Sequence, residues 1–154
     1  MVRYMANIRQ DRYSTEKDLK YALDFKDVLL VPKKCIVNSR KDISLSTIIS
    51  HNEHSNILLG IPLISANMDT ITGRDMACAM STWSGAGFLH RYQAYTDVME
   101  TILYMKAHNF HPIIPSIGVS PDEYWSEMAF LFLSNGADGI CIDIAHGHSE
   151  NMLK

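Results

Sequence analysis

The chain has 154 residues, about the length of one average domain, and its 47% hydrophobic and 20% charged content is ordinary for a globular protein. This composition excludes a disordered tail, a coiled coil and a collagen-like repeat. Acidic residues outnumber basic ones by 17 to 14, and the net charge of -3 gives no basic field for a phosphate backbone, so nucleic acid is not an expected partner.

Cysteine usage and hydropathy indicate the compartment. Cys35, Cys78 and Cys141 are odd in number and never in a CxxC spacing, and the first ten residues are too polar for a secretory signal. No apolar run reaches the roughly 18 residues that a membrane span needs. We therefore expect a soluble, cytoplasmic protein with no membrane partner.

The amino-terminal part of the chain differs from the rest. Residues 1–20 mix charged and polar side chains with little periodicity, which predicts an arm or a short helical extension. From Tyr21 the sequence is typical of a folded domain, with an apolar stretch that ends at Pro32, and residues 39–56 are polar enough for loops and sheet edges. We expect an arm over 1–20 and one folded domain over 21–154.

Four short apolar runs follow, rich in β-forming residues and of strand length. They begin at Ile61, Gly85, Pro112 and Ala137. Comparable positions, one in each run, recur every 25 or 26 residues: Pro62, Gly87, Ile113 and Gly139. Because segments of helix length separate the runs, this spacing predicts one strand and one helix per repeat.

The helix-length segments carry periodicity and boundary signals. In the first, a stripe at near-helical spacing comprises Met76, Ala77, Met80 and Trp83. In the second, Thr96 and Asp97 predict the N-cap. One side of that helix is expected to present Val98, Ile102 and Met105. In the third, Ser120 followed by Pro121 predicts the start, and Gly136 predicts a left-handed stop.

Strands with little polar alternation, each followed by a helix, are typical of a parallel sheet buried on both faces. An open doubly wound sheet and a (β/α)8 barrel both fit, and the absence of a GxGxxG turn after any strand favours the barrel. A complete barrel takes about 250 residues. We therefore expect an α/β fold that is the N-terminal half of a (β/α)8 TIM barrel, truncated in the fourth helix, with the C-terminal half supplied as a missing segment or a second chain.

Function in such a barrel collects at the carboxyl ends of the strands, and here these ends are polar. They comprise residues 65–70, 90–91, 116–118 and 143–148. Asp143 is the sharpest candidate, because it closes an apolar strand and would be desolvated unless a ligand or a neighbouring donor binds it. We favour contact with a ribose or an amide over the alternative, an N-cap for the helix after Ser149.

Other side chains near these ends are weaker candidates. His146 and His148 could ligate a metal, but no third ligand lies within reach along the sequence, so a polar turn is favoured and no metal is expected. Cys141 lies inside a strand and is interpreted as core. Cys78 on a helix and Cys35 in a polar loop have no histidine base beside them, so no catalytic thiol is expected.

Five motifs follow one another: DFKDVLLVPKKCIVNSR, GIPLISANMDTIT, GFLHRYQ, PSIGVSPDEY and GICIDIAHGHSEN. In this order and at these separations they resemble the amino-terminal half of the IMP dehydrogenase/GMP reductase family, and GMP reductase more closely. The resemblance runs from about Asp24 to the last residue. The short connection near Asn109 also favours GMP reductase, since many IMP dehydrogenases insert a pair of regulatory domains there.

The resemblance implies NADPH-dependent reductive deamination of GMP to IMP and ammonia. The positions that match the family's cofactor contacts are Ser39, Arg40, Arg91, Asp143, Ile144 and Ala145. Of these, Ser39 and Arg40 are expected to reach the dinucleotide from a neighbouring subunit, and Arg91 suits a phosphate. Asn67 and Met68 match the positions that pack the purine nucleotide.

The family's nucleophilic cysteine and phosphate-binding glycines belong to later strands, so no catalytic residue is expected in this chain, and no turnover by the chain alone. Any monovalent cation site would lie in the missing half. A homo- or hetero-oligomer is expected. Two alternatives stay open: the N-terminal half of an IMP dehydrogenase, which oxidises IMP to XMP with NAD, and a non-catalytic remnant that binds nucleotide.

Overall fold

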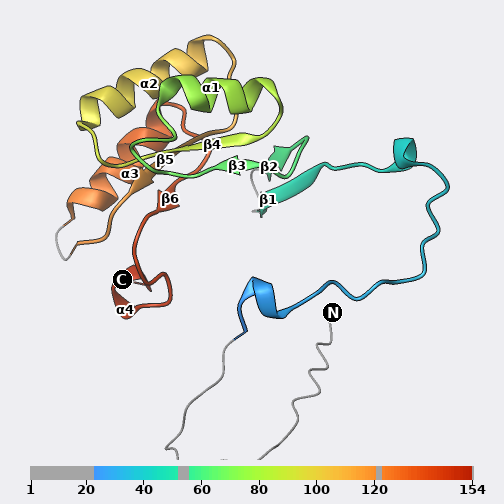
Figure 1. Ribbon diagram of the computed structural model, residues 1–154. Helices are drawn as coiled ribbons and strands as arrows, with labels where there is room; N and C mark the ends of the chain where they lie inside the picture. The colour runs from blue at the N-terminus through green and yellow to red at the C-terminus, as the bar shows by residue number, and fades with distance from the viewer. Residues whose placement is uncertain (1–22, 52–55, 121–122, 154) are drawn as a thin grey trace, which may run out of the picture. The chain divides into compact units, whose positions relative to one another are not determined.

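Figure 1 shows the computed structural model, which describes residues 23–51, 56–120 and 123–153. The chain divides into two compact units, Met1–Arg40 and Lys41–Lys154. The arm expected over residues 1–20 lies outside the described residues.

The described part of the first unit contains one short 3-10 helix, η1 (Phe25–Asp27). It forms because two carboxylates cap it reciprocally. The Phe25 N–H donates to Asp24 Oδ1 at 2.7 Å, and the Asp24 N–H donates to Asp27 Oδ2 at 3.0 Å. A second short 3-10 helix, η2 (Arg40–Asp42), lies at the boundary between the units.

The second unit opens with an antiparallel hairpin of β1 (Thr47–His51) and β2 (Asn56–Leu59). Loops and sheet edges were the expectation for residues 39–56, and the hairpin is more regular than that. The reason is local: the run from Thr47 through Ile49 is β-branched and prefers an extended backbone.

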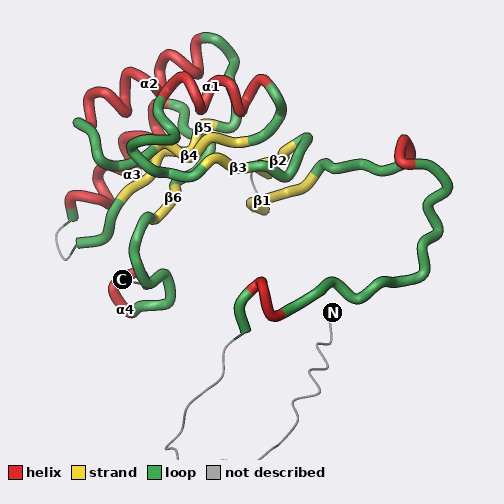
Figure 2. Tube along the Cα trace, in the orientation of Figure 1, coloured by secondary structure: helices red, strands yellow, loops and turns green. Residues whose placement is uncertain are grey.

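The main sheet has four strands in the described residues, and neighbouring strands are parallel. In the order in which they pair, they are β3 (Ile64–Ser65), β4 (Ala86–Leu89), β5 (Ile113–Ile117) and β6 (Cys141–Ile142). Each of the four expected apolar runs contains one of them. The parallel α/β arrangement is thus confirmed, and the curled sheet fits one side of a TIM barrel (Figures 1 and 2).

Helices alternate with these strands along the chain (Figure 2). They are α1 (Arg74–Thr82), α2 (Tyr95–Ala107), α3 (Tyr124–Asn135) and α4 (Glu150–Leu153). None of the helices in the described residues has the length and apolarity that crossing a bilayer requires.

Alternate residues of the strands serve two separate cores. On the helix side, Leu89 and Ile113 pack with the buried side chains of α1, α2 and α3. On the opposite face, Ala86 and Ile114 pack with Leu59 of the hairpin. The hairpin therefore covers part of the face that the helices leave open, and the period of two along each strand sorts the side chains between the cores.

Of the two predicted helical stripes, the one on α1 needs correction and the one on α2 is confirmed. Only part of the α1 stripe is buried: Ala77 is fully covered, whereas Met76 is 41% and Trp83 75% exposed. Ala77 decides the contact, because a Cβ on Gly87 of β4 would lie 2.5 Å from Ala77 Cα, so helix and strand are too close for larger side chains. The expected α2 stripe of Val98, Ile102 and Met105 is confirmed as buried.

The predicted N-caps are wrong. Ala94 occupies the N-cap of α2 without a side-chain bond, and Asp97 lies inside the first turn, where the helix dipole favours a carboxylate. Glu123, and not Ser120, occupies the N-cap of α3, because the side chains that pack on the sheet begin only at Trp125. The predicted Pro121 lies outside the described residues. The left-handed stop of α3 at Gly136 is confirmed, with φ of 114°.

Candidate functional site

An ion pair joins the carboxyl ends of β4 and β6. Arg91 lies two residues past β4, and Asp143 directly follows β6. Arg91 Nε donates to Asp143 Oδ2 at 3.1 Å across 52 residues of sequence. The donor that Asp143 needed is thus an arginine of the same chain, and the alternative N-cap role finds no support in this contact.

The ion pair is neither buried nor fully exposed, since the side chains of Arg91 and Asp143 are 29% and 27% exposed. The backbone of Asp143 is fixed as well, because its N–H donates to the Ile117 carbonyl at 2.8 Å and extends the β5–β6 ladder. Partial exposure leaves both charges within reach of a ligand, and the backbone bond keeps the carboxylate in place.

Tyr92 orients the guanidinium from a second side. The carbon Cζ of Arg91 lies 4.6 Å from the Tyr92 ring centroid, and Arg91 Nη2 donates to the Tyr92 hydroxyl at 3.2 Å. In the described residues no bond occupies Nη1. A guanidinium held by one edge and one face keeps donors for an anion such as a phosphate.

A tight turn follows β3 and carries Asn67 and Met68. The Met68 carbonyl accepts from the N–H groups of Ile71 and Thr72, both at 3.0 Å. Met68 itself is 51% exposed and Asn67 is half-buried. The fully buried Thr72 anchors the turn, because its hydroxyl lies 2.8 Å from Ser65 Oγ.

The remaining predicted contacts lie in two places. Ile144 and Ala145 follow Asp143 directly, the first half-buried and the second exposed. Ser39 and Arg40 are exposed and belong to the other unit of the chain. The ligand roles of all these positions stay predictions.

Two buried polar atoms close to the ion pair have no hydrogen-bond partner in the described residues. They are His90 Nδ1, directly before Arg91, and Ser116 Oγ on β5. The His90 backbone is fixed on both sides, because its N–H donates to the Thr72 carbonyl and its carbonyl accepts from Gln93 Nε2 at 3.0 Å. Unsatisfied buried polar atoms are uncommon in folded proteins and call for an explanation.

Sequence reasoning missed the structural parts of this site. Tyr92 stands beside the predicted Arg91 in the motif GFLHRYQ, and the neighbouring arginine and tyrosine are a signal for a cation–π contact. Thr72 lies within GIPLISANMDTIT, but nothing local marks a threonine that folds back on Ser65. Its role depends on the turn that brings the two together.

The three cysteines are free thiols. Burial raises the pKa of the Cys78 thiol, and the Asp75 carboxylate raises it further. A raised pKa lowers the thiolate fraction, which makes Cys78 a poor nucleophile. Cys141 packs beside the core of Leu59, Ala86 and Ile114, as expected for a core residue.

His146 and His148 lie in the turn between β6 and α4, with ring centroids 6.5 Å apart. No group of three or more metal-binding side chains occurs within the part of the chain that the structure describes.

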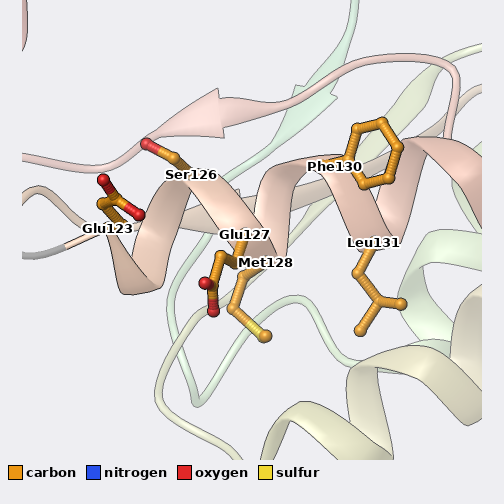
Figure 3. A pocket seen from close by; sticks show the side chains of 6 residues that line it. All are labelled: Glu123, Ser126, Glu127, Met128, Phe130 and Leu131. Carbon is orange, nitrogen blue, oxygen red and sulfur yellow. The ribbon is translucent and has the colours of Figure 1, made fainter.

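Figure 3 shows a pocket whose lining includes none of the candidate residues at the strand ends. Its lining comes from α3 and the residue before it: Glu123, Ser126, Glu127, Met128, Phe130 and Leu131. Phe130 projects to one side of the helix and Leu131 to the other, and Phe130 is 75% exposed. Among the described residues, two carboxylates and no cation line this pocket. Such a lining does not suit a phosphate, so we do not include the pocket in the candidate site.

Comparisons with known proteins agree with the motifs. A family model described as IMP dehydrogenase / GMP reductase domain matches residues 22–154. The GMP reductases of Buchnera aphidicola subsp. Baizongia pistaciae (strain Bp) and Escherichia coli O81 (strain ED1a) are 36% and 30% identical over 138 and 139 residues. These matches cover 90% of this chain but only 39% and 40% of the relatives, so the chain spans about two fifths of their length. The chain belongs to the IMP dehydrogenase/GMP reductase family.

Proposed function

We propose that this chain supplies the amino-terminal half of a (β/α)8 barrel that converts GMP to IMP and ammonia by NADPH-dependent reductive deamination. The observation that carries the proposal is the Arg91–Asp143 pair at the carboxyl ends of parallel strands, where barrel enzymes bind their ligands. The relatives named GMP reductase favour this reaction over the oxidation of IMP.

In this proposal each strand end binds a different part of the nucleotides. Arg91 binds a phosphate with the donors that Asp143 and Tyr92 leave available, and Asp143 accepts hydrogen bonds from ribose hydroxyls. Ile144 and Ala145 lie against the same cofactor. The exposed Met68 and neighbouring Asn67 pack the purine nucleotide.

Ser39 and Arg40 reach the dinucleotide of a neighbouring subunit, which makes the working enzyme an oligomer. Both residues are exposed, as such a role requires.

When bound, NADPH supplies the hydride. The residues of this chain bind and orient the nucleotides, and the nucleophilic cysteine and any monovalent cation site belong to the second half of the barrel. The outer strands favour such a completion. Ile64 on β3 and Ile142 on β6 are 46% and 40% exposed, and each strand has one edge that no strand of the described residues pairs.

The first experiment measures binding of NADPH to the full chain by nicotinamide fluorescence, with 2′,5′-ADP as competitor. Arg91→Ala is expected to weaken binding of both ligands about tenfold, because a charge-assisted contact to phosphate is lost. Arg74→Ala is the matched control, since Arg74 pairs with Glu100 on the exposed side of α1. Equal affinities of wild type and R91A contradict the proposed role of Arg91.

The second experiment measures NADPH oxidation with GMP, first by the chain alone and then after addition of a polypeptide that covers the remaining three fifths of a GMP reductase relative. Turnover is expected only in the mixture. Turnover by the chain alone contradicts the half-barrel proposal, and reduction of NAD with IMP in the mixture selects the dehydrogenase instead. Nucleotide binding without turnover in any mixture indicates a non-catalytic remnant.

A further inference from the structure

His90 and Ser116 carry polar atoms that folding has removed from water without giving them a partner. Their exposed fractions are 9% and 2%, and neither His90 Nδ1 nor Ser116 Oγ makes a hydrogen bond in the described residues. Most buried polar atoms in folded proteins are hydrogen-bonded, so these two call for an explanation.

The two residues come directly after the last paired positions of neighbouring strands. Leu89 of β4 pairs with Pro115 of β5, and His90 and Ser116 each follow one residue later. Side chains alternate along a strand, and Ile114 belongs to the core on the face away from the helices. Ser116, two residues on, shares that face. Adjacent strands are about 4.8 Å apart, which lets one small planar group contact both side chains.

The same register puts this pair next to the ion pair. Ser116 aligns with Cys141 on β6, and Asp143 is two residues further along the same strand, on the same face. His90 directly precedes Arg91. The two unsatisfied atoms therefore lie one step deeper in the sheet than the charges of the candidate site.

The chemistry of the two side chains selects the group that they can hold. Imidazole offers a donor or an acceptor, and a hydroxyl offers both. Arg91 is paired with Asp143 at 3.1 Å, and the proposed function assigns its remaining donors to a phosphate. A charged ligand group would lose its hydration here without a counter-charge, whereas a neutral group with one donor and one acceptor satisfies both atoms. A carboxamide is such a group.

We propose that His90 and Ser116 form a carboxamide subsite one step below the Arg91–Asp143 pair. The inference rests on the proposed function in one respect: the carboxamide it assigns is that of the nicotinamide ring. Both atoms are buried from water, so binding at this subsite requires rotation of Ser116 about χ1 and of the His90 ring about χ2.

The test compares two ligands that differ only at this group, nicotinamide mononucleotide and its carboxylate counterpart, nicotinic acid mononucleotide. Affinities for the full chain are measured by titration calorimetry. We expect the amide to bind about tenfold more tightly than the acid, and Ser116→Ala to reduce this preference to less than about twofold. Ser81→Ala is the control: its hydroxyl donates to the His111 carbonyl at the other end of the sheet, and the preference should persist.

Ser116→Ala should fold normally, because it removes a hydroxyl that has no partner in the described residues. If the variant does not fold, the ring nitrogens of His90 are followed by NMR in the unmodified chain. A shift with the amide and none with the acid supports the subsite, and no shift with either overturns it.

Equal binding of the two mononucleotides overturns the inference, since a water then suffices for both atoms. A preference for the acid also overturns the inference, because Arg91 and not the His90–Ser116 pair then binds the carboxylate. Absence of binding by both has the same result. Binding of 2′,5′-ADP, which lacks the nicotinamide, tests the proposed function separately. If 2′,5′-ADP binds while the amide preference is absent, the proposed function stands and the subsite is rejected. If the amide preference is present while 2′,5′-ADP does not bind, the subsite stands and the proposed function is rejected.

Discussion

The two ends of the parallel sheet each hold an aspartate that bonds to a basic side chain, yet they use it differently. At the amino end, Asp138 Oδ2 accepts from the backbone N–H of Ile113 and from the His111 ring, both at 2.7 Å. At the carboxyl end, Asp143 accepts from Arg91 at 3.1 Å and from no backbone N–H among the bonds described. The Asp138 carboxylate therefore accepts from both backbone and side chain, whereas the Asp143 carboxylate accepts, among the described residues, from a side chain alone.

The neighbours of the two aspartates differ in the same sense. Beside Asp138, the Ser81 hydroxyl donates to the His111 carbonyl at 2.7 Å, so it is satisfied by the fold. Beside Asp143, the Ser116 hydroxyl and His90 Nδ1 have no partner in the described residues. At the amino end, hydrogen bonds within the fold satisfy the polar side chains, and such bonds serve stability. At the carboxyl end, some buried polar atoms have no partner in the described residues, and these atoms are suited to bind a ligand.

The largest expected effect on stability is at the amino end. Asp138→Ala should lower the free energy of unfolding by about 2 kcal/mol, because it leaves the Ile113 N–H and the His111 ring without their charged acceptor. Urea titration followed by circular dichroism measures this. NADPH affinity should not change. A variant as stable as wild type would contradict a stabilising role for the hydrogen bonds at the amino end of the sheet.

Ser81→Ala should cost about 1 kcal/mol, the usual size of one neutral hydrogen bond. The same substitution at Ser116 should change the free energy of unfolding by less than about 0.5 kcal/mol, since no bond is lost there. Parallel urea titrations of the two variants measure the difference. Equal losses would mean that Ser116 has a partner in solution and that the two ends do not differ.

Asp143→Ala should lower stability by no more than about 0.5 kcal/mol, because its pair with Arg91 is part-exposed and screened by solvent. Its effect should appear instead in ligand binding, as an approximately tenfold weaker affinity for NADPH. Urea titration and fluorescence titration of one protein preparation give both numbers. A stability loss as large as that of D138A, with affinity unchanged, would reverse the roles of the two ends.

The smallest expected effect concerns the thiols. The folded chain holds the Cys78 proton to higher pH than the unfolded chain, because burial and then Asp75 raise its pKa. Its contribution to stability is complete below the unfolded thiol pKa and is lost as the pH rises through the folded value. Cys78→Ala should therefore flatten the alkaline decline of stability slightly. Iodoacetamide at pH 8 should modify Cys35 first; faster reaction of Cys78 would contradict its burial.

Much of the fold could be predicted because its signals are local. Runs of apolar residues recurring every 25 or 26 positions predicted the strands, and the glycine at position 136 predicted the end of α3. The errors arose where packing overrides local preference. Trp83 fits the helical stripe, but the close approach of Ala77 to Gly87 leaves it outside the core.

The sequence by itself determined that this is a parallel α/β chain of one family with polar residues at its strand ends, because periodicity and motifs are written within short stretches. Only the tertiary structure decided that Arg91 meets Asp143 across 52 residues and that His90 and Ser116 directly follow a residue pair of neighbouring strands. These neighbours depend on strand order and register, which arise from the crossover helices packing on the sheet and not from any segment alone.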